Sequence, residues 1–152
     1  MFFSLHIVFK AFGAFFLGFI SMFPPVLRFF YFLGLYKNIH FEKIEKHYKP
    51  GTLVTSNTSG IPIHLLEEGR SDVFMKNFCG THFFNPPRYL RLLEIIPTSK
   101  TDPAVIDFLM HYGDVFLGKE TVLCKDTPAF IANRVGVYAM AKVFQLTQEL
   151  GL

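Results

Sequence analysis

Short apolar runs, separated by polar or proline-containing breaks, occupy the chain from about residue 41 onward. Runs of this length that are rich in β-branched or aromatic residues and bounded by turn residues are typical of buried strands. The pattern predicts strands at Thr52–Thr55, Gly80–Phe84, Leu92–Ile96 and Thr121–Lys125.

Helix-like segments separate these runs. Asp102 can cap a helix whose first turn contains Pro103, and Gly118 suits the position just past its end. An earlier segment starts at Pro62 and predicts one or two helical turns that end at Gly69.

A long helix of some twenty residues is predicted at the C-terminal end, where Thr127 precedes Pro128 and Gly151 closes the apolar pattern. Strands that alternate with helices indicate an α/β fold with a parallel sheet. Ligands of such sheets bind beyond the carboxyl ends of the strands. The polar stretches "SNTSG", "NPP" and "KDTP" each follow a predicted strand.

Residues 1–40 have a different composition. Residues 1–36 hold eleven of the twenty phenylalanines, and the first acidic residue is Glu42. The run Phe2–Phe23 has the length of a bilayer-spanning helix, although Lys10 near its middle opposes insertion by about 3 kcal/mol. Three interpretations stay open: a membrane anchor, a helix buried against the rest of the chain, or an unrelated sequence upstream of a truncated gene.

Composition narrows the function classes. The 152 residues suit one domain, and 51% hydrophobic with 18% charged residues do not suggest disorder. The net charge of +3 comes from scattered Lys and Arg, which does not indicate a nucleic-acid partner. Cys79 and Cys124 lie far apart among apolar neighbours, so we predict buried, reduced thiols and no metal site.

Two polar residues interrupt the apolar runs. His82 lies near the end of one predicted strand, and Glu94 follows twelve positions later inside the next. Each alone is more typical of a satisfied core or edge residue. Together they could also form a catalytic pair, because a histidine gains and releases protons near neutrality.

The motifs "SNTSG", "GTHFFNPPRYLRLLEIIP", "LGK" and "CKDTPAFIANRVG" occur in this order. Together they closely resemble the NAD-dependent 3-hydroxyacyl-CoA dehydrogenases of fatty-acid β-oxidation. "GIPIHLLEEGRS" is most similar to the large bacterial multidomain enzymes of that family. The resemblance covers roughly Phe41–Leu152.

The resemblance implies a role for five residues. His82 matches the family's acid/base catalyst, and Glu94 matches its carboxylate partner. Ser59 and Asn133 match residues that contact the substrate, while Ser59 and Asn85 match residues beside the NAD cofactor. The implied substrate is a (3S)-3-hydroxyacyl-CoA, which the enzyme oxidises to the 3-oxoacyl-CoA.

The implied fold is the C-terminal half of a Rossmann-type NAD-binding domain with parallel strands, preceded by the apolar helical segment. We divide the chain into residues 1–40, a partial NAD-binding domain at 41–127, and a long helix at 128–152 that leads to a helical domain. The family's GxGxxG turn does not occur in the sequence, so the NAD cradle is expected to be incomplete.

We therefore expect an oxidoreductase of this family that is inactive as the chain alone, and that resides in the cytoplasm. Two alternatives remain. The chain could be a membrane-associated remnant without catalysis, anchored through residues 2–23. It could also be one subunit of a split enzyme.

Overall fold

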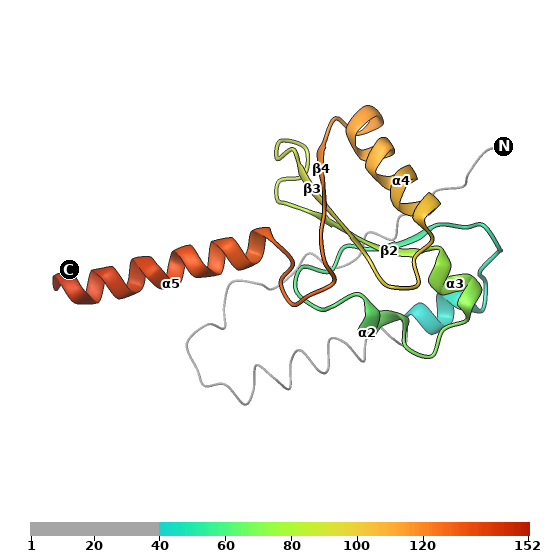
Figure 1. Cartoon of the computed structure of the whole chain (residues 1–152), viewed down its shortest axis with the longest axis horizontal. Coiled ribbons are helices and arrows are strands. Elements are labelled where there is room, and N and C mark those ends of the chain that lie inside the picture. The colour runs from blue at the N-terminus through green and yellow to red at the C-terminus, as the bar shows by residue number, and fades with distance from the viewer. Residues whose placement is uncertain (1–39) are drawn as a thin grey trace.

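The computed structural model describes residues 40–152. The hypothesis of a membrane anchor or buried helix at residues 2–23 lies outside the described residues. A four-stranded sheet with the order β1-β2-β3-β4 forms the centre of the domain (Figure 1). The strands lie close to the predicted positions: β1 is Val54–Ser56, β2 is Phe78–Phe83, β3 is Leu92–Pro97 and β4 is Glu120–Leu123.

The predicted α/β fold with parallel strands is confirmed for two of the three strand pairs, and the third pair is antiparallel. β1 runs parallel to β2 and β3 parallel to β4, but β2 and β3 are antiparallel. Only residues 84–91 join β2 to β3, and a parallel crossover needs a dozen or more residues. β1 and β2 therefore end at one edge of the sheet, and β3 and β4 end at the opposite edge.

Helices cover both faces of this sheet (Figure 1). Residues 40–45 are helical, and α3 (Asp72–Lys76) is a short helix that the sequence pattern did not predict. The Ser71 hydroxyl caps α3 by accepting from the Phe74 N–H at 3.4 Å. The other helices are α2 (His64–Glu67), α4 (Pro103–His111), the π-helix η1 (Tyr112–Phe116) and α5 (Ala132–Leu150).

The predicted cap of α4 is confirmed, because the Asp102 carboxylate accepts from the Ala104 N–H at 2.9 Å. The helix does not continue regularly to Gly118, since it changes to the π-helix η1 at Tyr112. Gly113 lies in that turn against β4, and a Cβ there would come within 2.4 Å of Thr121 Cγ2. This close approach requires glycine at the turn.

The long C-terminal helix begins later than predicted. Ala129 and Phe130 have left-handed φ values of 62° and 48°, so the backbone after Pro128 is not helical and α5 starts at Ala132. Gly151 ends the helix in a left-handed conformation, as its sequence position predicted. α5 extends away from the sheet (Figure 1). None of the helices within residues 40–152 has the length and apolarity needed to cross a membrane.

Side chains alternate between the two faces of the central strands, as the period of two in a strand requires. In β2, Phe78 packs into one hydrophobic cluster and Cys79 into the other. In β3, Ile96 packs into the same cluster as Phe78, and Ile95 packs into the same cluster as Cys79. The larger cluster contains residues from α2, α3 and the helix at 40–45; the smaller one contains Leu109 of α4. Both faces are therefore part of the core.

One buried carboxylate has no cationic partner within hydrogen-bonding distance among the described residues. Glu67 of α2 is 5% exposed and accepts a hydrogen bond from the Thr98 hydroxyl at 3.1 Å. Burial raises the pKa of Glu67 above its ordinary value, although the Thr98 hydrogen bond opposes this. The native state therefore binds this proton more tightly than the unfolded state, and stability falls as pH rises above about 4.5.

Glu67→Gln is accordingly expected to stabilise the chain at neutral pH by on the order of 1 kcal/mol, because the amide keeps an acceptor for Thr98 without a buried charge. Thermal melts at about pH 7.5 and pH 4 should show the gain at the higher pH and little gain at the lower. Glu68→Gln, next to it but exposed, is the control and should change neither melt. An equal gain at both pH values would contradict the assignment to Glu67.

Candidate active site

His82 and Glu94 face each other across the antiparallel strands β2 and β3, where they are register partners. The His82 Nδ1 and Glu94 Oε2 atoms are 2.7 Å apart. The two side chains are only 5% and 1% exposed. The predicted proximity of these residues is confirmed, and the pair lies on the face of the sheet that carries Phe78 and Ile96.

The hydrogen bond orients the imidazole. A carboxylate only accepts, so Nδ1 carries the hydrogen, and in the neutral imidazole the other ring nitrogen, Nε2, then has the lone pair. Within residues 40–152, no hydrogen bond to Nε2 is found. The rings of Phe84 and Phe130 lie against the imidazole, with centroids 4.4 Å and 5.8 Å away. One nitrogen is held in place while the other can exchange a proton.

The second oxygen of Glu94 contacts the start of α5. Oε1 accepts from the backbone N–H groups of Ile131 at 3.0 Å and Ala132 at 2.8 Å. No side chain at the N-cap position, Ile131, performs this task. The partial positive charge of a helix N-terminus stabilises a carboxylate. Glu94 therefore serves both as the partner of His82 and as the cap of α5.

Two other predicted site residues lie together. The Asn133 side-chain amide donates to the Ser59 carbonyl oxygen at 2.6 Å, which joins the start of α5 to the loop after β1. Asn85 is exposed in the loop after β2. No hydrogen bond links Asn85 to the other four predicted site residues in the described part of the chain.

Sequence reasoning did not single out two polar residues that organise this region. Asn57 accepts from the Phe83 N–H at 2.9 Å and so joins the ends of β1 and β2. Asp126 accepts from the N–H groups of Ile63 and His64 at the start of α2. Each follows a strand and belongs to a residue type that caps backbone N–H groups, but the partners are distant in sequence and no local spacing reveals them.

Both cysteines are free and buried, as predicted. Burial raises the pKa of each thiol to about 12, and the nearby Glu94 carboxylate adds to the effect at Cys124. Neither thiol is therefore suited to act as a nucleophile at neutral pH. Across residues 40–152, no cluster of three His, Cys, Asp or Glu side chains is arranged to hold a metal ion.

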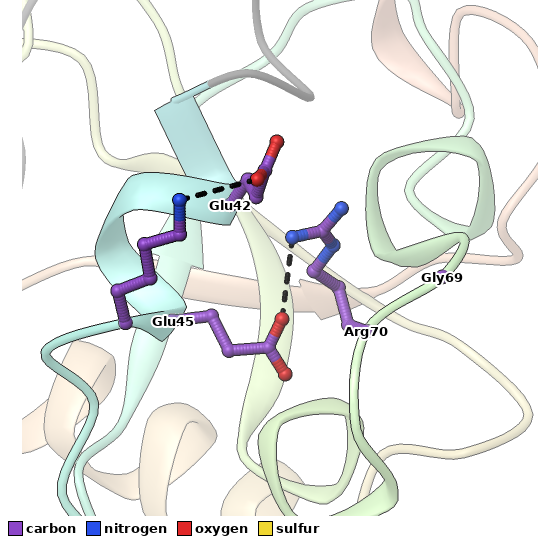
Figure 2. Close-up of a pocket in the computed structure, with 5 residues that line it drawn as sticks. Glu42, Glu45, Gly69 and Arg70 are labelled. Carbon is purple, nitrogen blue, oxygen red and sulfur yellow. Dashed lines mark hydrogen bonds and ion pairs between the residues drawn. The ribbon is translucent and has the colours of Figure 1, made fainter.

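A depression of about 390 Å³ lies between the helix at 40–45 and the loop after α2. Its charged side chains are paired: Arg70 Nη1 lies 3.2 Å from Glu45 Oε2, and Lys46 Nζ lies 3.4 Å from Glu42 Oε1. Figure 2 shows the Arg70 side chain directed toward Glu45. None of the predicted site residues lines it. The four charged groups that line it form ion pairs with one another.

Comparison with known proteins identifies the family of this chain. Residues 35–127 match the family described as 3-hydroxyacyl-CoA dehydrogenase, NAD binding domain. A probable 3-hydroxyacyl-CoA dehydrogenase of Deinococcus radiodurans is 50% identical over 111 residues, which are 73% of this chain and 32% of that protein. One of Bacillus subtilis is 52% identical over 105 residues, which are 69% of this chain and 13% of that protein.

The crystal structure of 3-hydroxybutyryl-CoA dehydrogenase from Escherichia coli superposes with a TM-score of 0.70 at 29% identity. The match covers 76% of this chain and 24% of that one. The chain thus spans a third or less of these three relatives. The matched family and the similar fold lead to one conclusion: the chain belongs to the NAD-binding domain family of the 3-hydroxyacyl-CoA dehydrogenases.

Proposed function

We propose that this chain carries the proton-transfer site for oxidation of a (3S)-3-hydroxyacyl-CoA to the 3-oxoacyl-CoA, with NAD as cofactor, in fatty-acid β-oxidation. The observation that supports this best is the buried His82–Glu94 pair with a free Nε2. A proton acceptor of this kind is what the oxidation of a secondary alcohol requires. The family to which the chain belongs supports the substrate class.

In the proposed reaction, His82 Nε2 accepts the proton of the 3-hydroxyl group. The Glu94 carboxylate keeps the hydrogen on Nδ1 and stabilises the imidazolium that forms. Phe84 and Phe130 limit access of water to the ring and thereby strengthen this electrostatic interaction. In the reverse direction, the same nitrogen returns the proton to the ketone oxygen.

We propose that Ser59 and Asn133 hold the substrate oxygen, since they meet beside the N-terminus of α5. Ser59 and Asn85 would hold NAD, which supplies a hydride acceptor when bound. Both are exposed in loops after the parallel strands β1 and β2, at the edge where ligands of such sheets bind. A Cβ placed on Gly60 in the same loop would meet nothing within 4 Å, so this edge has open space for a ligand.

The sequence contains no GxGxxG turn, the element that binds the pyrophosphate in Rossmann-type domains. We therefore expect the 152-residue chain to show no saturable NAD binding below about millimolar by calorimetry, because backbone N–H groups of that turn normally hold the phosphates. The Deinococcus radiodurans relative, measured in parallel, serves as the positive control. A micromolar dissociation constant for this chain would contradict the expectation.

The proposed function is tested by transplantation. The matched 111 residues of the Deinococcus radiodurans relative are replaced by those of this chain, and NADH formation from a 3-hydroxyacyl-CoA is measured. Activity is expected, since the transplanted part brings the His82–Glu94 pair and the host brings the remaining contacts to NAD. An intact, NAD-binding chimera without activity would favour a non-catalytic remnant. Activity that appears only when this chain is mixed with a separate NAD-binding half would favour a split enzyme.

We propose a division of the chain into domains on the basis of the same family membership. Residues 41–127 form the partial NAD-binding domain, and residues 128–152 lead out of it through a turn and the long helix α5, Ala132–Leu150. A cytoplasmic location is proposed from the family alone. Separating the full chain between membranes and buffer after expression would show whether residues 1–40 change that location.

A further inference from the structure

The loop between β4 and α5, residues 124–131, connects several parts of the proposed site. At its end, the Ile131 N–H donates to Glu94. In its middle, the Ala129 N–H donates to the Gly60 carbonyl at 3.2 Å, and the Phe130 ring packs on His82. The position of this loop therefore determines where the N-terminus of α5 meets Glu94.

The loop adopts a strained backbone. Ala129 and Phe130 both have left-handed φ values, 62° and 48°, and neither is a glycine. This conformation is unfavourable for a residue with a Cβ atom, and it persists only where the surroundings impose it. Contacts elsewhere in the loop must therefore hold it in place.

Asp126 provides such contacts. Its Oδ1 accepts from the Ile63 N–H at 2.5 Å, and its Oδ2 accepts from the His64 N–H at 2.8 Å. The His64 Nδ1 atom lies 2.7 Å from the same Oδ2. The Asp126 side chain is only 12% exposed. Charged hydrogen bonds of this kind are stronger than neutral ones, so Asp126 ties the loop firmly to the start of α2.

The start of α2 is a rigid anchor. Ile63 and Leu66 are fully buried in the larger hydrophobic cluster. Ile63 packs so closely on β2 that a Cβ at Gly80 would come within 2.7 Å of its Cδ1 atom. Asp126 therefore connects the loop to an element that rests directly on the strand carrying His82.

We propose that Asp126 is a positioning residue of this site: it fixes the loop so that Glu94 caps α5, and through Glu94 it orients the His82 imidazole. The catalytic meaning of this inference rests on the proposed function. The effect of Asp126 on the orientation of the His82 imidazole can be measured in the 152-residue chain without any catalytic assay.

The test is NMR of the full 152-residue chain labelled with ¹⁵N at histidine, recorded at about pH 9, well above the ordinary histidine pKa of about 6.5. The ring-nitrogen signals of His82 are identified as those that are missing from the spectrum of His82→Gln. The wild-type ring should be the Nδ1–H tautomer, with widely separated shifts for its two nitrogens. In Asp126→Ala the two shifts should converge, because the imidazole samples both tautomers once Glu94 loses its fixed position.

Asp126→Asn preserves the shape of the side chain but not its charge, and an intermediate convergence is expected. It decides the question if Asp126→Ala does not fold. Asp107→Ala, on the exposed face of α4, is the matched control and should leave the His82 signals unchanged. A folded Asp126 variant in which His82 retains a single Nδ1–H tautomer would overturn the inference.

A second readout uses the active chimera. There, Asp126→Asn should lower kcat by about 10- to 100-fold with little change in KM, since a misplaced base impairs chemistry more than binding. An unchanged kcat would also overturn the positioning role. The chimera's response to His82→Gln tests the proposed function separately, so the failure of one proposal can be told from the failure of the other.

Discussion

His82→Gln in the active chimera is expected to reduce the rate of NADH formation by about 10²- to 10⁴-fold, the usual contribution of general acid–base catalysis. Glutamine has a similar length and still offers a hydrogen-bond donor to Glu94, so the fold around the pair should persist. It cannot accept the substrate proton. The loss should appear in kcat, with KM for the acyl-CoA little changed.

His47→Gln is the matched control. His47 is exposed, precedes β1 in the sequence and is not one of the predicted site residues. It should leave the rate unchanged. Circular dichroism and NAD affinity of the His82 variant should equal those of the unmodified chimera. A folded, NAD-binding variant that turns over at the original rate would show that another group takes the proton.

Sequence patterns located the strands well because each apolar run is short and is bounded by small polar residues, a proline or charged residues. They could not give the direction of β3. The Asn85-Pro86-Pro87 break shows that the chain stops at the end of β2, but a stop alone does not say whether the next strand returns or crosses over. The length of the connection, residues 84–91, does carry that information.

The start of α5 was predicted too early for a different reason. Thr127 before Pro128 has the chemistry of a helix start, and local propensity favours it. The tertiary contacts of Asp126 with α2 and of Phe130 with the core override that preference and place a left-handed turn there. Contacts between residues 62 or 63 positions apart leave no periodic trace in the sequence.

The identity of the paired residues was predictable, whereas their surroundings were not. The resemblance gave His82 and Glu94 together, and a 2.7 Å contact between them followed once β2 and β3 paired in register. The two N–H groups of α5 that also bind Glu94 depend on where that helix begins. The double role of Glu94 was therefore visible only in the folded chain.

That double role predicts a large loss of stability on truncation. Glu94→Ala in the 152-residue chain should lower the free energy of unfolding by about 3–5 kcal/mol, because it removes a buried carboxylate that accepts three hydrogen bonds and leaves each donor without a partner. The change leaves three donors without their acceptor: His82 Nδ1 and the N–H groups of Ile131 and Ala132. Urea unfolding followed by circular dichroism measures the change.

Glu94→Gln should cost less, on the order of 1–3 kcal/mol, because its one carbonyl oxygen can still accept from one of the two sides while its amide faces the donors on the other. Glu120→Ala on β4 is the control for removing a glutamate from the same sheet. Glu120 is 67% exposed and pairs with Arg91 at the surface, where such an ion pair contributes about 0–1 kcal/mol. If Glu94→Ala were no more destabilising than Glu120→Ala, the Glu94 carboxylate would not be the common partner of His82 and α5.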